Sequence, residues 1–173
     1  MGKRRIRNLQ HLGFNDIVGF DTRNDRLTES ERKYHIVTTK SFDESITNTP
    51  DLMIISTPPD HHLKFVKFAV KHKIPFFTEL NLLSFHVKKI QQLSSETNTL
   101  GFPSCTMKFH PLIRELKKLI NKKVIGKILF VKHHSGQYLP YWHPWEDYRN
   151  FFVSKKETGG ARELVPIELM WLI

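Results

Sequence analysis

The sequence predicts an α/β fold, in which helices cover both faces of a doubly wound parallel sheet. Residues 52–55 are all apolar, as a central strand requires when both of its faces are covered. A second strand, 75–78, follows the helical segment 61–72, in which apolar residues recur at spacings of three and four. A strand, a helix and a strand in this order predict a right-handed crossover between parallel neighbours.

The residues before this unit also alternate between helix and strand. The first helix should span 2–12 and stop at Gly13, and strand 16–20 should end at Asp21. Weaker signals follow, and they predict a helical segment at 29–33, a strand at 35–38, and a short helix through Ile46 that is capped by Ser41 or Asp43. The first half of the chain therefore contains the repeated units of a doubly wound sheet.

The pattern changes after about residue 107. A helix around 87–93 and a short strand at 104–108 should complete a first domain, residues 1–107. The second part, 108–173, should begin an α/β domain of its own, with these elements: a helix at 110–121, a long strand at 127–134, an aromatic-rich loop at 136–148, a turn at Gly159-Gly160 and a helix starting at Pro166. Since the last five residues are apolar, we expect the sequence to stop inside an element of a larger fold.

Composition excludes several classes of protein. The chain has 173 residues, 39% of them hydrophobic and 25% charged, which is typical of a globular protein, and no apolar run approaches the roughly 20 residues of a membrane helix. We expect a cytoplasmic protein. The single cysteine excludes an intrachain disulfide framework, and the adjacent histidine pairs at 61–62 and 133–134 lack the spacing of metal ligands, so we expect no metal.

The formal charge of +10 raises the question of nucleic-acid binding. The lysines mostly fall on the polar faces of separate amphipathic segments, which indicates solvated helices. We therefore expect no nucleic-acid partner.

The N-terminus matches the tail of a dinucleotide-binding motif. That motif consists of a strand, a G-x-G-x-x-G turn and a helix that holds a pyrophosphate, with an acidic residue about 20 positions later that binds the ribose. Gly2 stands where the last glycine would be, Lys3 and Arg4 begin the helix, and Asp21 has the required spacing. The alternative is that Gly2 merely belongs to a basic N-terminus. The first interpretation predicts a Rossmann-type sheet whose first strand is missing.

Motifs in the same order resemble the glucose-fructose oxidoreductase / inositol dehydrogenase / MocA (Gfo/Idh/MocA) family. The matching segments are Gly2-Lys3-Arg4, the turn from Ser56 to His62, Thr78-Glu79, Lys108-Phe109-His110-Pro111, Gly126-Lys127-Ile128, and Trp142-His143-Pro144 with Asp147-Tyr148-Arg149 before Gly159-Gly160. The resemblance runs through essentially the whole chain. It implies an NAD(P)-dependent oxidoreductase that acts on a sugar, sugar-nucleotide or polyol by hydride transfer. Members often form homo-oligomers through the sheet of the second domain.

The resemblance also implies cofactor-binding residues. Asp21 as ribose acceptor would favour NAD, whereas Arg23, with Arg26, would accommodate the 2'-phosphate of NADP, so both cofactors stay open. Ser56, Thr57 and Pro58 would shape the cofactor ledge. His62 would lie beside the nicotinamide and Glu79 beside its ribose. The structural alternatives are a rigid turn, a capping histidine and a hydrogen-bonded carboxylate.

Two departures from the family bear on catalysis. Leu80 replaces the lysine that would lie by the nicotinamide and the substrate hydroxyl, and Asn81 replaces the proline after it. The segment 163–168 lacks the histidine expected in the helix after the double glycine. We therefore assign the acid/base role to the loop residues His143, Asp147 and Tyr148, and we keep two alternatives: a binding homologue without catalysis, and a non-functional fragment of such an enzyme.

Overall fold

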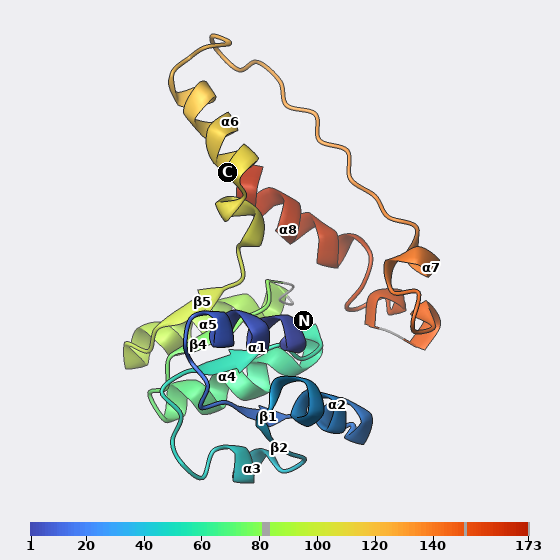
Figure 1. Ribbon diagram of the computed structural model, residues 1–173. Coiled ribbons are helices and arrows are strands. Elements are labelled where there is room, and N and C mark those ends of the chain that lie inside the picture. The colour runs from blue at the N-terminus through green and yellow to red at the C-terminus, as the bar shows by residue number, and fades with distance from the viewer. Residues whose placement is uncertain (81–83, 151, 173) are drawn as a thin grey trace. The chain divides into compact units, whose positions relative to one another are not determined.

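The computed structural model describes residues 1–80, 84–150 and 152–172 (Figure 1). Contacts divide the chain into two compact units. The first comprises Met1–Thr57, His61–Thr78 and Lys89–Phe102, and the second comprises Pro58–Asp60, Glu79–Lys88 and Pro103–Ile173. A functional boundary near residue 107 stays a prediction.

The strands that the structure describes lie in the first unit, apart from the last residue of the fifth. They are β1 (Val18–Phe20), β2 (Val37–Thr39), β3 (Met53–Ile55), β4 (Phe76–Thr78) and β5 (Gly101–Pro103). β1 pairs with β2 in parallel, and β3 pairs with β4 in parallel. The strands form one sheet of order β1-β2 and another of order β3-β4-β5. The α/β class with parallel sheets is therefore confirmed.

The helices of this part lie where the sequence predicts helices, although the second begins at Asn24 instead of residue 29 and the fifth extends beyond 87–93 at both ends. They are α1 (Gly2–His11), α2 (Asn24–Tyr34), α3 (Phe42–Ser45), α4 (His62–Lys71) and α5 (Ser84–Thr97). The Ser41 hydroxyl caps α3 by accepting a hydrogen bond from the backbone amide of Glu44 at 3.2 Å, as predicted. Gly13 follows α1 with a φ of 89°, a backbone conformation that favours glycine.

The core of the first unit lies between α4 and the strands. α4 buries Val66 and Ala69 completely, because its apolar residues recur on one face. A cluster of phenylalanine rings continues this core, with centroids 5.0–6.0 Å apart: Phe20 of β1, Phe42 of α3, and Phe65 and Phe68 of α4. These contacts fix α3 and α4 on the strands.

The second unit consists of helices and irregular segments in its described residues. Its helices are α6 (Pro111–Asn121), α7 (Leu139–Trp142) and α8 (Ala161–Leu172), with short 3₁₀ turns at Thr106–Phe109, Tyr148–Asn150 and Phe152–Ser154. None of the helices that the structure describes is long and apolar enough to cross a membrane.

The predicted strand 127–134 is wrong, because this segment has no regular structure (Figure 1). Its side chains are largely exposed, and Leu129 is 86% exposed. A strand is stable only with a hydrogen-bonded neighbour, and no described strand pairs with this segment. The alternation of apolar and polar residues in this segment therefore favours a strand that the structure does not form.

Three smaller predictions also need correction. The last strand of the first part spans Gly101–Pro103 instead of 104–108, because the Phe76 amide bonds the Leu100 carbonyl, which brings β5 beside β4 earlier in the chain. α8 begins at Ala161 instead of Pro166, so Pro166 lies inside it and removes one helical hydrogen bond. The predicted loop 136–148 includes the short helix α7. Asn81 lies outside the described residues.

Candidate functional site

The N-terminus of α1 lies against the carboxyl end of β3. A side-chain carbon placed on Gly2 would be 3.9 Å from the Cβ of Ser56, the residue directly after β3. Helix N-termini carry free N–H groups and a partial positive charge, which favour anions. The structure therefore brings together Gly2 and Ser56, two predicted cofactor-binding residues that lie far apart in the sequence.

Asp21 follows β1 and its carboxylate faces the start of α2. Its Oδ1 accepts a hydrogen bond from the backbone amide of Arg23 at 2.9 Å, and its Oδ2 lies 3.7 Å from the guanidinium of Arg26. The Arg23 guanidinium bonds Asp25 instead. A fixed carboxylate and two guanidinium groups are thus gathered at the end of β1. Their contact with a ribose or a 2'-phosphate stays a prediction.

Lys3 and Arg4 occupy the first turn of α1. Lys3 forms an ion pair with Glu29 of α2. The hydrogen bond from Lys3 holds the pKa of the Glu29 carboxyl below its usual value of 4.5, with a smaller contribution from nearby lysine and arginine charges. Arg4 is exposed. The lysine is therefore engaged with α2, while Arg4 extends the positive charge at this end of α1.

His62 is completely buried at the start of α4. Its Nε2 donates a hydrogen bond to the Thr57 carbonyl at 2.7 Å, and its Nδ1 lies 3.4 Å from the hydroxyl of Thr78, at the end of β4. Because a carbonyl only accepts, Nε2 carries the proton and Nδ1 accepts from the threonine. The ring thus connects the turn after β3 to β4. A contact of His62 with a cofactor stays a prediction.

Thr57 provides an unsatisfied polar group in this turn. Its Oγ1 is buried and has no hydrogen-bond partner in the part of the chain that the structure describes. A buried hydroxyl without a partner is costly. Such an atom at the carboxyl end of a parallel strand is a candidate contact for a bound ligand.

The remaining predicted residues belong to the second unit. Pro58 is exposed and precedes the 3₁₀ turn Pro59–His61. Glu79 and Leu80 are half-buried. Their predicted position beside a nicotinamide stays untested.

The loop residues form a local network around His143. Its Nδ1 lies 2.9 Å from Oε1 of Glu146, and its ring stacks on Trp145 with centroids 4.9 Å apart. A carboxylate at this nitrogen fixes the ring orientation and favours a proton on Nδ1. The sequence analysis missed Glu146, although the spacing of three residues was a usable signal.

Asp147 and Tyr148 make only local contacts. The Asp147 carboxylate accepts a hydrogen bond from the backbone amide of Arg149 at 3.0 Å, and the Arg149 guanidinium lies over the Tyr148 ring at 4.8 Å. The structure thus gives His143 a carboxylate partner, Glu146, and the acid/base roles of all three residues stay predictions.

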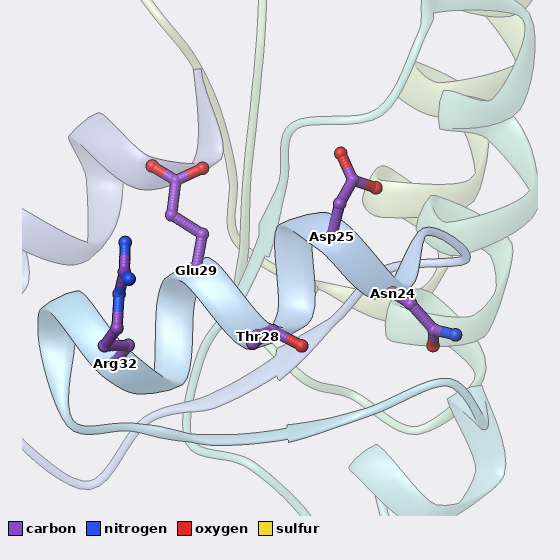
Figure 2. Close-up of a pocket in the computed structure, with 5 residues that line it drawn as sticks. All are labelled: Asn24, Asp25, Thr28, Glu29 and Arg32. Atoms are coloured by element: carbon purple, nitrogen blue, oxygen red, sulfur yellow. The ribbon is translucent and has the colours of Figure 1, made fainter.

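A shallow depression of about 400 Å³ lies along α2. Figure 2 shows the five residues that line it, which are Asn24, Asp25, Thr28, Glu29 and Arg32. All five belong to one helix, and Asp25 and Glu29 are already paired with Arg23 and Lys3. We therefore place the candidate site at the strand ends, where several elements contribute polar groups.

The groups at the strand ends suit a dinucleotide. The start of α1 offers N–H groups and positive charge for a pyrophosphate, Asp21 offers a carboxylate for ribose hydroxyls, and Thr57 offers a hydroxyl. All of these positions belong to the first unit.

Comparison with known proteins supports the fold. No protein-family model matches the chain, and no curated protein matches it. Among solved structures, a probable dehydrogenase from Thermotoga maritima is 23% identical with a TM-score of 0.57, and the match covers 64% of this chain and 34% of that one. Myo-inositol 2-dehydrogenase from Lactobacillus plantarum is 18% identical with a TM-score of 0.60, covering 65% and 34%.

Levoglucosan dehydrogenase, solved with NADH and levoglucosan, is 20% identical with a TM-score of 0.57, covering 66% of this chain and 32% of that one. The chain thus spans about a third of the length of these proteins. It has the α/β fold of their matching part.

Proposed function

We propose that this chain is the nucleotide-binding part of an NAD(P)-dependent oxidoreductase of the Gfo/Idh/MocA type, acting on a sugar or polyol. The observation that carries the proposal is the gathering of the α1 N-terminus, Asp21 and the Ser56-Thr57 turn at the carboxyl ends of parallel strands. Three structures with this fold are dehydrogenases, and one was solved with NADH.

Each group has a defined part in the proposed binding. The N–H groups of α1 and the charge of Arg4 hold the pyrophosphate. Asp21 accepts hydrogen bonds from the ribose hydroxyls, and the Thr57 hydroxyl gains a partner from the ligand. Arg23 and Arg26 are engaged with Asp25 and Asp21, so a 2'-phosphate would have to displace these pairs. We therefore propose NAD as the preferred cofactor.

In the proposed reaction, the substrate is an alcohol whose carbon gives a hydride to the nicotinamide while its hydroxyl loses a proton. The cofactor supplies the hydride chemistry. His143 is the proposed base, with Nε2 as the accepting atom, because Glu146 favours the proton on Nδ1.

A test of the cofactor proposal uses calorimetric titration of the chain with NAD⁺ and NADP⁺. We expect saturable binding of NAD⁺ that Asp21→Ala weakens about tenfold, since a hydrogen-bonded charged contact contributes about 1.5–3 kcal/mol. Asp16→Ala is the matched control, because Asp16 is an exposed aspartate before the same strand. Equal binding by both variants, or no binding of either cofactor, would contradict the proposal.

Leu80 supports a second candidate, a protein that binds the cofactor without catalysis. The family lysine that would polarise the substrate oxygen is a half-buried leucine here. An assay of NAD⁺ reduction with inositols and simple sugars separates the candidates. Turnover that His143→Ala abolishes supports the enzyme, whereas binding with no turnover of any of these alcohols supports the binding protein.

A further inference from the structure

Helix α6 leaves an apolar face exposed. Leu112, Leu116 and Leu119 recur at spacings of four and three residues, which places them on one side of the helix. These residues are 73%, 44% and 41% exposed. A helix of a globular protein normally buries such a face against a core. The exposed face of α6 therefore suits an apolar partner.

The turn after α6 extends this apolar surface. The Lys123 amide donates to the Ile120 carbonyl at 2.9 Å, and the Val124 amide donates to the Leu119 carbonyl at 3.2 Å. With Lys123 at a φ of 55°, these two bonds form a Schellman motif, which folds the following residue back towards the last turn of the helix. Val124 and Ile125 are 64% and 70% exposed. The α6 apolar face, as we define it, comprises Leu112, Leu116, Leu119, Val124 and Ile125.

Basic side chains surround this face. Arg114, Lys117 and Lys118 recur at spacings of three and four on the other side of α6, and all three are exposed. Lys122 and Lys123 follow in the exposed turn. Between positions 111 and 132 the chain has seven basic residues and one acidic residue. A partner of the α6 apolar face should therefore carry negative charge.

The acidic residue of this segment offsets little of the charge. The Glu115 carboxylate lies 3.0 Å from Nζ of Lys118, and these side chains are 57% and 65% exposed. Ion pairs exposed to this degree are weak and are screened by salt. Since the other six basic residues have no further carboxylate within the segment, its surface stays strongly positive.

The irregular chain between α6 and α7 has the same character (Figure 1). Lys127 and Lys132 flank four apolar residues, of which Leu129 and Phe130 are 86% and 80% exposed. A backbone without regular hydrogen bonds cannot enter the hydrocarbon interior of a bilayer. Such a segment can lie among hydrated headgroups, where its apolar side chains and lysines both find favourable surroundings.

Charge decides between the possible partners. A second copy of this chain would bring like charges together, which is unfavourable. A nucleic acid would pair with the basic groups through its phosphates but would leave the apolar side chains in water. The surface of an anionic bilayer offers negative headgroups and an apolar boundary at once.

We propose that the α6 apolar face docks on the surface of a membrane that contains anionic phospholipids. Its apolar side chains enter the boundary between headgroups and acyl chains, and the surrounding basic side chains reach the charged headgroups. α6 has 11 residues, whereas a helix that crosses a bilayer needs roughly 20. The helix therefore lies in the plane of the interface.

The test is co-sedimentation of the whole chain with vesicles. One set consists of phosphatidylcholine alone, and the other contains phosphatidylserine as one third of its lipid. We expect binding to the anionic vesicles to be tighter by about tenfold or more, since each basic residue near an anionic surface contributes about fivefold. Samples without vesicles correct for chain that sediments alone.

A first pair of variants tests the charge. Lys117→Glu together with Lys122→Glu should weaken binding to the anionic vesicles about tenfold or more. The matched control is Lys67→Glu together with Lys71→Glu, which changes the total charge equally at exposed positions of α4. This control should retain most of the binding.

A second pair of variants tests the apolar contact. Leu112→Ser together with Ile125→Ser should weaken binding about tenfold, because two side chains no longer enter the acyl boundary. Both residues are largely exposed, so the chain should stay folded. The matched control is Leu12→Ser together with Leu100→Ser, which are 69% and 60% exposed and belong to the first unit.

Three outcomes would overturn the proposal. The first is equal binding to both kinds of vesicle, or binding to neither. The second is a loss of binding in the charge variant alone, together with tight binding of a DNA duplex, which would make a nucleic acid the partner. The third is self-association without vesicles that Leu112→Ser with Ile125→Ser abolishes, which would make a second copy the occupant. No readout depends on cofactor binding, so this proposal and the proposed function can fail separately.

Discussion

His62 shows how a single buried residue organises the candidate site. It is completely buried, and its ring connects the turn after β3 to the end of β4. The same turn carries Ser56 and Thr57. The position of these two residues therefore depends on a hydrogen-bonded histidine that is inaccessible to solvent.

We expect His62→Ala to lower the free energy of unfolding by about 2–4 kcal/mol, because it leaves a cavity and two unsatisfied polar groups. The measurement is urea denaturation followed by circular dichroism. His61→Ala is the control, because His61 is exposed and should change stability by less than about 0.5 kcal/mol. Similar losses in both variants would mean that the buried hydrogen bonds have no special role.

The Lys3–Glu29 pair predicts a pH effect. The pKa of Glu29 is lowered in the folded chain, chiefly by the hydrogen bond from Lys3. A lowered pKa stabilises the fold above the unfolded pKa of Glu29, and this stabilisation is lost as the pH falls through the folded pKa. Lys3→Met should therefore return the Glu29 pKa towards 4.5 in an NMR titration.

Lys118→Met is the control for this titration, because Lys118 pairs with Glu115 on α6. It should leave the Glu29 titration unchanged. An unchanged pKa of Glu29 in Lys3→Met would contradict the pairing.

His143 and Glu146 predict a separation of kinetic effects if the chain takes part in catalysis. Glu146→Gln should leave cofactor binding unchanged and should lower kcat about 10-fold or more, since a correctly oriented base contributes about 10²–10⁴-fold. An unchanged kcat in Glu146→Gln would contradict the role of Glu146 in orienting His143.

The sequence was sufficient for some site residues and insufficient for others. The places of Gly2 at the start of α1 and of Asp21 after β1 were predictable from motif spacing, whereas their roles in binding a cofactor stay predictions. The ion pair of Lys3 with Glu29 was not, since it depends on how α1 packs on α2. The burial of His62 was likewise invisible, because it depends on Thr78 in a strand 16 residues away.

At the scale of elements, β5 depends on a glycine. A side-chain carbon on Gly101 would lie 2.4 Å from the ring of Phe76, which is 1% exposed. We expect Gly101→Ala to lower the free energy of unfolding by about 1–3 kcal/mol, because the added methyl group overpacks the core. Gly136→Ala is the matched control, because nothing lies within 4 Å of the added carbon. Thermal denaturation distinguishes the two, and equal stability would show that the ring moves freely.

At segment 127–134 the sequence pattern predicts an element that the structure does not contain. Its alternation predicts a strand, and its residues favour one, but pairing needs a neighbour that the described residues do not provide. The helices were predicted better, because α4 and α6 satisfy their own backbone hydrogen bonds. Leu112 of α6 is 73% exposed. The apolar periodicity of this helix could therefore be recognised in the sequence although its apolar face is not buried.

At the scale of the whole molecule, the fold class was predictable and the break in the strand layer was not. The sequence indicates parallel strands, but it does not show whether all of them would pair into one sheet. In the structure they stay apart as two sheets. Phe20 and Phe65 hold the two parts through side chains instead of backbone bonds.

The central claim is that a dinucleotide binds at the strand ends of the first unit. The most direct test is an NMR titration of the isotope-labelled chain with NADH, followed through the backbone amide signals. We expect saturable shifts at Gly2, Lys3, Asp21, Ser56 and Thr57. No saturable shift, or shifts confined to the depression along α2, would contradict it.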